Sequence, residues 1–218
     1  MRFSLLFLGS ALLFTGCSSV YYGAMEKVGI PKRKILVDRV GEAREAQQEA
    51  KAQFSSALAE FLAVTKVPAS ELQATYENLD REFKRSETRA TEVRDRIAAI
   101  DNVAQALFQE WSDELALYKS PALRSQSERQ LATTRNRYAA LMRTMEQASA
   151  RMTPVVDAFR DQVLFLKHNL NAQAISALGG STRELQQDIA RLIADMEKSI
   201  READAFIASM QSAPTPAP

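Results

Sequence analysis

The sequence predicts an all-α protein in which long antiparallel coiled-coil helices form a four-helix bundle with a protruding two-helix hairpin arm. Two observations lead to this fold class. Apolar residues recur at alternating spacings of four and three, the heptad pattern by which one helix packs against another. Gly and Pro are few, at 7 each, and aromatic residues make up only 7% of the chain. Such a composition suits long helices better than a β fold rich in turns.

Charge and composition exclude several classes of function. The chain has 28 Lys and Arg against 27 Asp and Glu, so no net field draws in a nucleic acid. A single cysteine cannot form an intramolecular disulfide, and with a single histidine it provides too few ligands for a usual zinc or haem site. We therefore expect no nucleic-acid partner, no metal and no other cofactor.

Residues 1–16 have the pattern of a signal peptide. Met1 and Arg2 form a short positive end, and an almost unbroken apolar run extends from Phe3 to Phe14. That run is well short of the roughly 20 residues with which a helix crosses a bilayer. We expect this segment to direct export and then to be removed.

The residues before Cys17 resemble the lipobox of bacterial lipoproteins, in which small residues directly precede a cysteine, although Phe14 stands where leucine is most frequent. The resemblance implies that Cys17 is lipidated, with acyl chains of the palmitate type, and anchors the mature chain firmly to a lipid bilayer. Ser18 is similar to the residue that directs lipoproteins to the outer membrane, facing the periplasm. The alternative is a secreted protein in which Cys17 has no role.

The tether and the first helix follow the cysteine. Residues 17–31 contain two glycines and a proline, which is typical of a tether. The helical coiled-coil domain is expected at 32–211. Its first helix begins near Lys32 and ends before Pro68. The seam of that helix has one polar position and consists of Leu36, Val40, Ala43, Gln47, Ala50, Phe54, Ala57, Phe61 and Val64.

The second helix carries the most regular heptad pattern. Ser70 and Gln73 have the spacing of a capping box, which predicts the start of this helix. Charges of both signs fill the positions between the seam residues, as on a solvated helix exterior. The seam consists of Leu72, Tyr76, Leu79, Phe83, Ser86, Ala90, Val93, Ile97, Ile100, Ala104, Leu107 and Trp111.

The third and fourth helices complete the domain. Ser120 and Pro121 suit a cap and a first helical position, so a helix is expected to begin there. It should continue to Gly179 with a kink at Pro154, because the seam keeps its phase on both sides. The fourth helix is expected from about Thr182 to Gln211, and a disordered tail at 212–218.

Unequal helix lengths predict the hairpin arm. Helices rise 1.5 Å per residue, so the two middle helices are much longer than the outer two. Short connections make neighbours antiparallel. The outer helices then cover only part of the middle pair, and the stretch from about Asp101 to Arg137 is expected to project. We expect the arm to point toward the same side as the tether.

The lipobox, the charged heptads and the segment FLKHNLNAQA at 165–174 together resemble a family of uncharacterised proteobacterial lipoproteins with a coiled-coil domain of unknown function. This likeness extends over nearly the whole mature chain. It implies a location in the cell envelope and a helical shape. It implies no activity, substrate or catalytic residue.

Two groups of residues are candidates for contact with a partner or a membrane. The first crowds the tip of the expected arm with apolar side chains: Phe108, Trp111, Leu115, Leu117 and Tyr118. Plain packing within the hairpin is the alternative. The second is a basic triplet after the tether, which could contact lipid headgroups or be a solvated helix start: Lys32, Arg33 and Lys34.

These patterns predict a non-catalytic, membrane-anchored periplasmic lipoprotein. It would act as a coiled-coil scaffold or protein-interaction module with an unidentified envelope protein or a second copy of itself. One alternative is a membrane-active helical protein that binds or remodels bilayers through the arm. Another is a hydrolase of the cell wall or of lipids with a polar cleft. The sequence contains no phosphate loop, no G-x-S-x-G and no H-E-x-x-H motif, so no catalytic residue is predicted.

Overall fold

Four long helices make up most of the computed structural model, which describes residue 25 and residues 29–64, 66, 68–169, 171 and 179–212. The helices are α2 (Lys32–Val64), α3 (Leu72–Glu114), α4 (Pro121–His168) and α6 (Gly179–Ser212), with short 3₁₀ turns η1 (Ala69–Glu71) and η2 (Leu115–Leu117). No strand occurs among the described residues, so the all-α prediction is confirmed. The predicted signal peptide, Cys17 and most of the predicted tail lie outside them.

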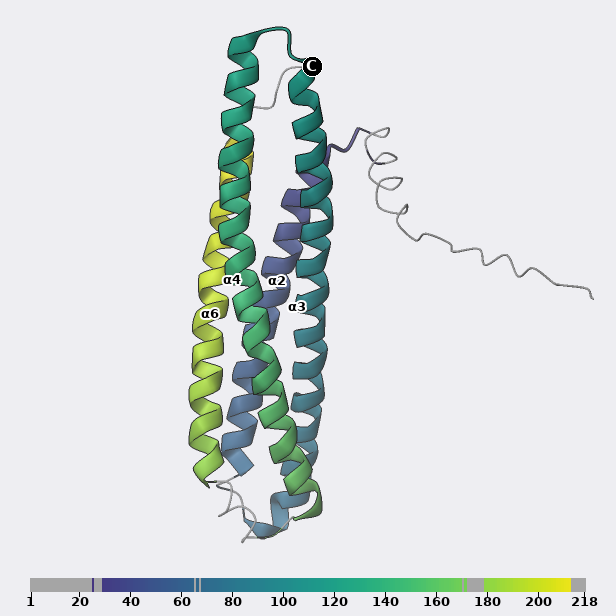
Figure 1. Ribbon diagram of the computed structural model, residues 1–218. Coiled ribbons are helices and arrows are strands. Elements are labelled where there is room, and N and C mark those ends of the chain that lie inside the picture. Colours follow the sequence, from purple (N-terminus) through teal and green to yellow (C-terminus); the bar gives the residue numbers. More distant parts are fainter. Residues whose placement is uncertain are drawn as a thin grey trace, which may run out of the picture.

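The helices form a ring in which each packs on two neighbours (Figure 1). In order around the ring they are α2, α3, α4 and α6, and consecutive helices run antiparallel. The most extensive contact joins α2 and α3. Small buried side chains on these two helices let their backbones approach closely: Ala43, Ala46, Ala50, Ala57 and Ala90.

The core is a continuous apolar seam to which all four helices contribute. Phe159 of α4 lies between two other rings in edge-on geometry, with centroids 5.9 Å from Phe61 and 5.8 Å from Phe83. The predicted heptad positions of α2 are buried along its whole length, including the polar Gln47. The seam predicted from the sequence is therefore the observed core of that helix.

Contacts at one end of the bundle show how far α2 and α6 extend along α3 and α4. Lys32, the first residue of α2, has its Nζ 3.1 Å from Oε1 of Glu110, and Arg33 donates to the backbone carbonyl of Met210 near the end of α6. The projecting part of the hairpin therefore begins near Glu110 rather than at Asp101, and is much shorter than predicted. Apolar residues continue to the ends of α2 and α6, and their burial lengthens the four-helix region.

The ends of the helices confirm some sequence signals and correct others. The Ser120 side chain caps α4 by accepting from the backbone nitrogen of Leu123 at 3.4 Å, as predicted. The predicted capping box at Ser70 is absent, because α3 begins at Leu72 after a 3₁₀ turn, without a side-chain cap. The third helix ends at His168, well before the predicted end at Gly179, where α6 already begins.

Two glycines provide a matched test of the α2 backbone. A Cβ added at Gly41 or at Gly29 would meet no atom within 4 Å, but Gly29 has a φ of 81° and Gly41 lies inside the helix. Gly41→Ala should raise the free energy of unfolding by roughly 0.5–1 kcal/mol, since glycine is a poor helix former. Gly29→Ala should lower it by about 1 kcal/mol, because alanine disfavours positive φ. Urea unfolding measures both, and equal effects would contradict this assignment of the backbone.

Candidate interaction site

The two most exposed large apolar side chains of the described residues lie where α3 is joined to α4. We call residues 115–124 the hairpin turn. The 3₁₀ turn η2 follows α3, Tyr118 is extended, and Ser120 caps α4, which begins at Pro121. Leu117 is 71% exposed and Leu123 is 55% exposed. Exposed leucines on so short a turn leave an apolar surface that the bundle does not cover.

The structure divides the five predicted apolar contact residues into two sets. Leu117 and Tyr118 are exposed, whereas Phe108 is buried and Trp111 and Leu115 are partly buried against the core. The Trp111 indole N–H donates to Ser127 Oγ at 2.8 Å, which ties α3 to α4. Phe108, Trp111 and Leu115 therefore pack within the hairpin, and the accessible part of the predicted group is Leu117 with Tyr118.

Two of the three predicted basic contact residues serve the fold instead. Lys32 pairs with Glu110, and only 10% of its side chain is exposed. Arg33 donates a hydrogen bond to the backbone carbonyl of Met210 in α6, and burial lowers the pKa of its guanidinium. Lys34 is 62% exposed and pairs with Asp38 at 2.7 Å, one helical turn away. Only Lys34 therefore faces solvent enough to meet a headgroup.

A polar contact holds the base of the hairpin together. The Tyr138 hydroxyl of α4 donates to Asp101 Oδ1 of α3 at 2.7 Å, and the Tyr138 ring lies edge-on to Phe108 with centroids 5.3 Å apart. Arg135 stacks over the same Phe108 ring. Burial is the largest cause that raises the pKa of Tyr138, followed by the hydrogen bond to Asp101. The hairpin is thus a rigid support for its turn.

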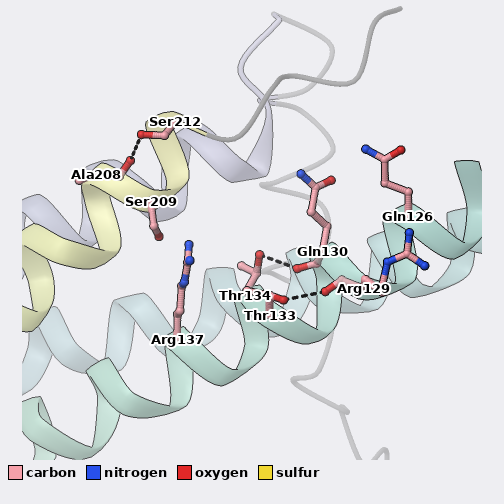
Figure 2. Close-up of a pocket in the computed structure, with 9 residues that line it drawn as sticks. All are labelled: Gln126, Arg129, Gln130, Thr133, Thr134, Arg137, Ala208, Ser209 and Ser212. Carbon is pink, nitrogen blue, oxygen red and sulfur yellow. Dashed lines mark hydrogen bonds between the residues drawn. The ribbon is translucent and has the colours of Figure 1, made fainter.

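A polar groove of about 650 Å³ opens between α4 and α6. Figure 2 shows Arg137 extending from α4 toward Ser209 of α6. Its lining contains no carboxylate or imidazole that could act as a general base: Gln126, Arg129, Gln130, Thr133, Thr134, Arg137, Ala208, Ser209 and Ser212. The hydroxyls of Thr133 and Thr134 donate to backbone carbonyls of their own helix. The groove has the polarity that the hydrolase hypothesis requires, and its lining provides no carboxylate or imidazole.

Three exposed apolar residues are not among those predicted from the sequence. Leu123 adjoins Leu117 and Tyr118 in the hairpin turn, whereas Leu164 and Phe165 lie near the end of α4, at the opposite end of the bundle. The signal for them was present, since none occupies a seam position of its helix. Apolar residues outside the seam of a regular coiled coil have no place in its core.

The described residues contain no group of three or more His, Cys, Asp or Glu placed to hold a metal ion. Within the same residues, no helix is long and apolar enough to cross a membrane.

The fold and this site define an antiparallel all-α bundle with an exposed apolar turn at one end. The chain belongs to the family described as "Protein of unknown function (DUF2959)", which matches residues 21–210. No curated protein and no solved structure matches the chain. The family thus covers the helical bundle and leaves the first twenty residues outside it.

Tyr138→Phe tests the base of the hairpin through its pH dependence. The folded pKa of Tyr138 lies above the unfolded value of about 10, so the hydroxyl stabilises the fold at neutral pH and that stability is lost as pH rises above about 10. The variant should be less stable by about 1 kcal/mol at neutral pH. Urea unfolding at several pH values should show this difference shrinking in alkali. A constant difference would contradict the assignment.

Proposed function

We propose that this protein is a non-catalytic lipoprotein, anchored through Cys17 to a membrane of the cell envelope, whose bundle serves as a scaffold for another protein. The single observation that carries the anchor is the order of the first residues: a positive end, an apolar run to Phe14, then Gly16 and Cys17. The family match begins at residue 21. That start agrees with a leader that is separate from the helical domain.

The proposed anchor is consistent with where the bundle begins. Lys32 lies beside Glu110, so α2 starts at the end of the bundle that carries the hairpin turn. Met25 and Ile30 pack against the core, so the eight residues 17–24 link Cys17 to the packed chain and span at most about 30 Å when fully extended. An acylated Cys17 would therefore keep this end close to the membrane, and the outer membrane facing the periplasm is the location we propose.

The opposite end offers the surface for a protein partner. Leu164 is 49% exposed and Phe165 is 40% exposed, near the end of α4. From an anchor at the other end, α4 would extend this patch by about 70 Å, because its 48 residues rise 1.5 Å each. A scaffold needs such a surface away from the lipid. Aromatic and aliphatic anchors of this kind form the centre of protein interfaces.

A bilayer-remodelling protein is the second candidate, and the exposed hairpin turn is the observation that favours it. Such a protein should cause leakage or tubulation of lipid vesicles. A scaffold should cause neither.

Replacing the cysteine tests the anchor. Cys17→Ala should release the protein from the membrane fraction or leave it unprocessed, since the acyl chains supply the membrane affinity. Ser19→Ala is the matched control and should remain membrane-bound. Fractionation of cells with immunodetection measures both. A Cys17→Ala protein that is fully processed and still membrane-bound would rule out the anchor.

Photo-crosslinking in cells tests the scaffold. A photoreactive residue in place of Phe165 should capture one defined envelope protein, identified by mass spectrometry. The same group in place of Lys198, an exposed residue of α6, is the control and should capture much less. Crosslinks to lipid alone from position 165, or equal yields from both positions, would count against a partner surface there.

A further inference from the structure

The hairpin turn differs in composition from the rest of α3 and α4, the two helices that it joins. Residues 115–124 read LALYKSPALR, with seven apolar residues, two basic residues and no acid. Three of the five large apolar side chains that are exposed in the described part of the chain lie here: Leu117, Tyr118 and Leu123. Apolar side chains flanked by cations are the combination that binds an anionic lipid surface.

The charges beside the turn support the same conclusion. Lys119 is exposed and forms no ion pair with any described residue. Arg124 pairs with Glu128 at 2.9 Å, with just over half of its side chain exposed. Asp113 and Glu114 precede the turn on α3, and Asp113 accepts from Gln109. Lys119 lies two residues after Leu117 and Arg124 directly follows Leu123, whereas Glu114 lies three residues before Leu117 and Glu128 five residues after Leu123.

The position of the turn brings it within reach of a membrane. Leu117 lies seven residues beyond Glu110, the partner of Lys32, so the turn projects by roughly 10 Å past the start of α2. Residues 17–24, which precede the packed Met25, can span more than twice that distance. This step rests on the proposed anchor at Cys17. A lipid there would hold the turn against the same bilayer at a high effective concentration, so a weak contact is sufficient.

We propose that the hairpin turn is a second membrane-contact site, which places Leu117, Tyr118 and Leu123 in the interfacial layer of the phospholipid bilayer. Lys119 and Arg124 contact anionic headgroups. Tyrosine suits this layer because its ring is apolar and its hydroxyl is polar. Contact through the turn would set the bundle's orientation on the membrane.

The single cysteine and the single tryptophan of the chain allow a direct test. Cys17 is its only cysteine, so a chain that begins there can be coupled to a maleimide-bearing lipid at the position of the proposed natural anchor. Trp111 is its only tryptophan and lies in the last turns of α3, close to the hairpin turn. Vesicles of phosphatidylcholine and phosphatidylglycerol that contain brominated lipid should quench Trp111 fluorescence when the turn enters the bilayer.

Variants separate the apolar contribution from the charge. L117S/L123S should lose most of the quenching, since each leucine contributes on the order of tenfold to insertion. The matched control L117M/L123M should retain it, because methionine is also apolar and of similar size. K119Q/R124Q should weaken quenching with phosphatidylglycerol and leave it unchanged with phosphatidylcholine alone. Circular dichroism verifies the helical content of each variant.

Several results would overturn the proposal. One is equal quenching of the original chain and L117S/L123S, and another is no quenching of either. A defined protein captured in cells from position 117, without quenching by vesicles, would assign the turn to a protein partner. Because coupling is chemical, the result does not depend on acylation in cells. Loss of the anchor claim and loss of this claim are therefore distinguishable.

Discussion

The burial of α2 and α6 against the long α3–α4 hairpin is the interaction on which the rest of the structure depends. The seams of α2 and α6 are covered by the hairpin and by each other, so both helices run along the hairpin as far as their apolar residues continue. The contacts of Lys32 with Glu110 and of Arg33 with Met210 lie near the end of this burial. Beyond that level Ile30 and Leu115 still pack partly against the core, whereas Leu117 in the hairpin turn is exposed.

The contact between α2 and α6 includes buried polar side chains. Gln47 of α2 and Ser199 of α6 are fully buried, and neither side chain has a hydrogen-bond partner within the described protein. The ion pairs Arg44–Asp204 and Lys51–Glu197 lie on either side of both residues, so they occupy the same stretch of the α2–α6 contact. An unpaired buried polar group costs roughly 1–3 kcal/mol. Polar groups here therefore weaken the contact that holds α2 to α6.

The sequence predicted the helices and their seams well because heptad spacing directly reflects burial. It predicted helix ends less well. The Ser70 signal failed because a 3₁₀ turn forms there, and the end of α4 at His168 has no proline or glycine to mark it. The predicted hairpin arm was too long because helix lengths alone do not determine how far each helix extends along its neighbours. At the candidate site, the sequence leaves open whether Phe108 and Trp111 meet a partner or pack within the hairpin, because apolar residues alone do not distinguish the inner face of a hairpin from its turn.

The central claim is that α2 begins at the end of the bundle that carries the hairpin turn. Both the proposed anchor and the proposed contact with lipid depend on it. Pulsed electron paramagnetic resonance tests it most directly, with spin labels on paired cysteines in a Cys17→Ser background. The structure predicts that a label at 34 lies about 15 Å along the bundle from one at 119, and about 50 Å from one at 164. A distance from 34 to 164 that is equal to or shorter than the distance from 34 to 119 would contradict the account.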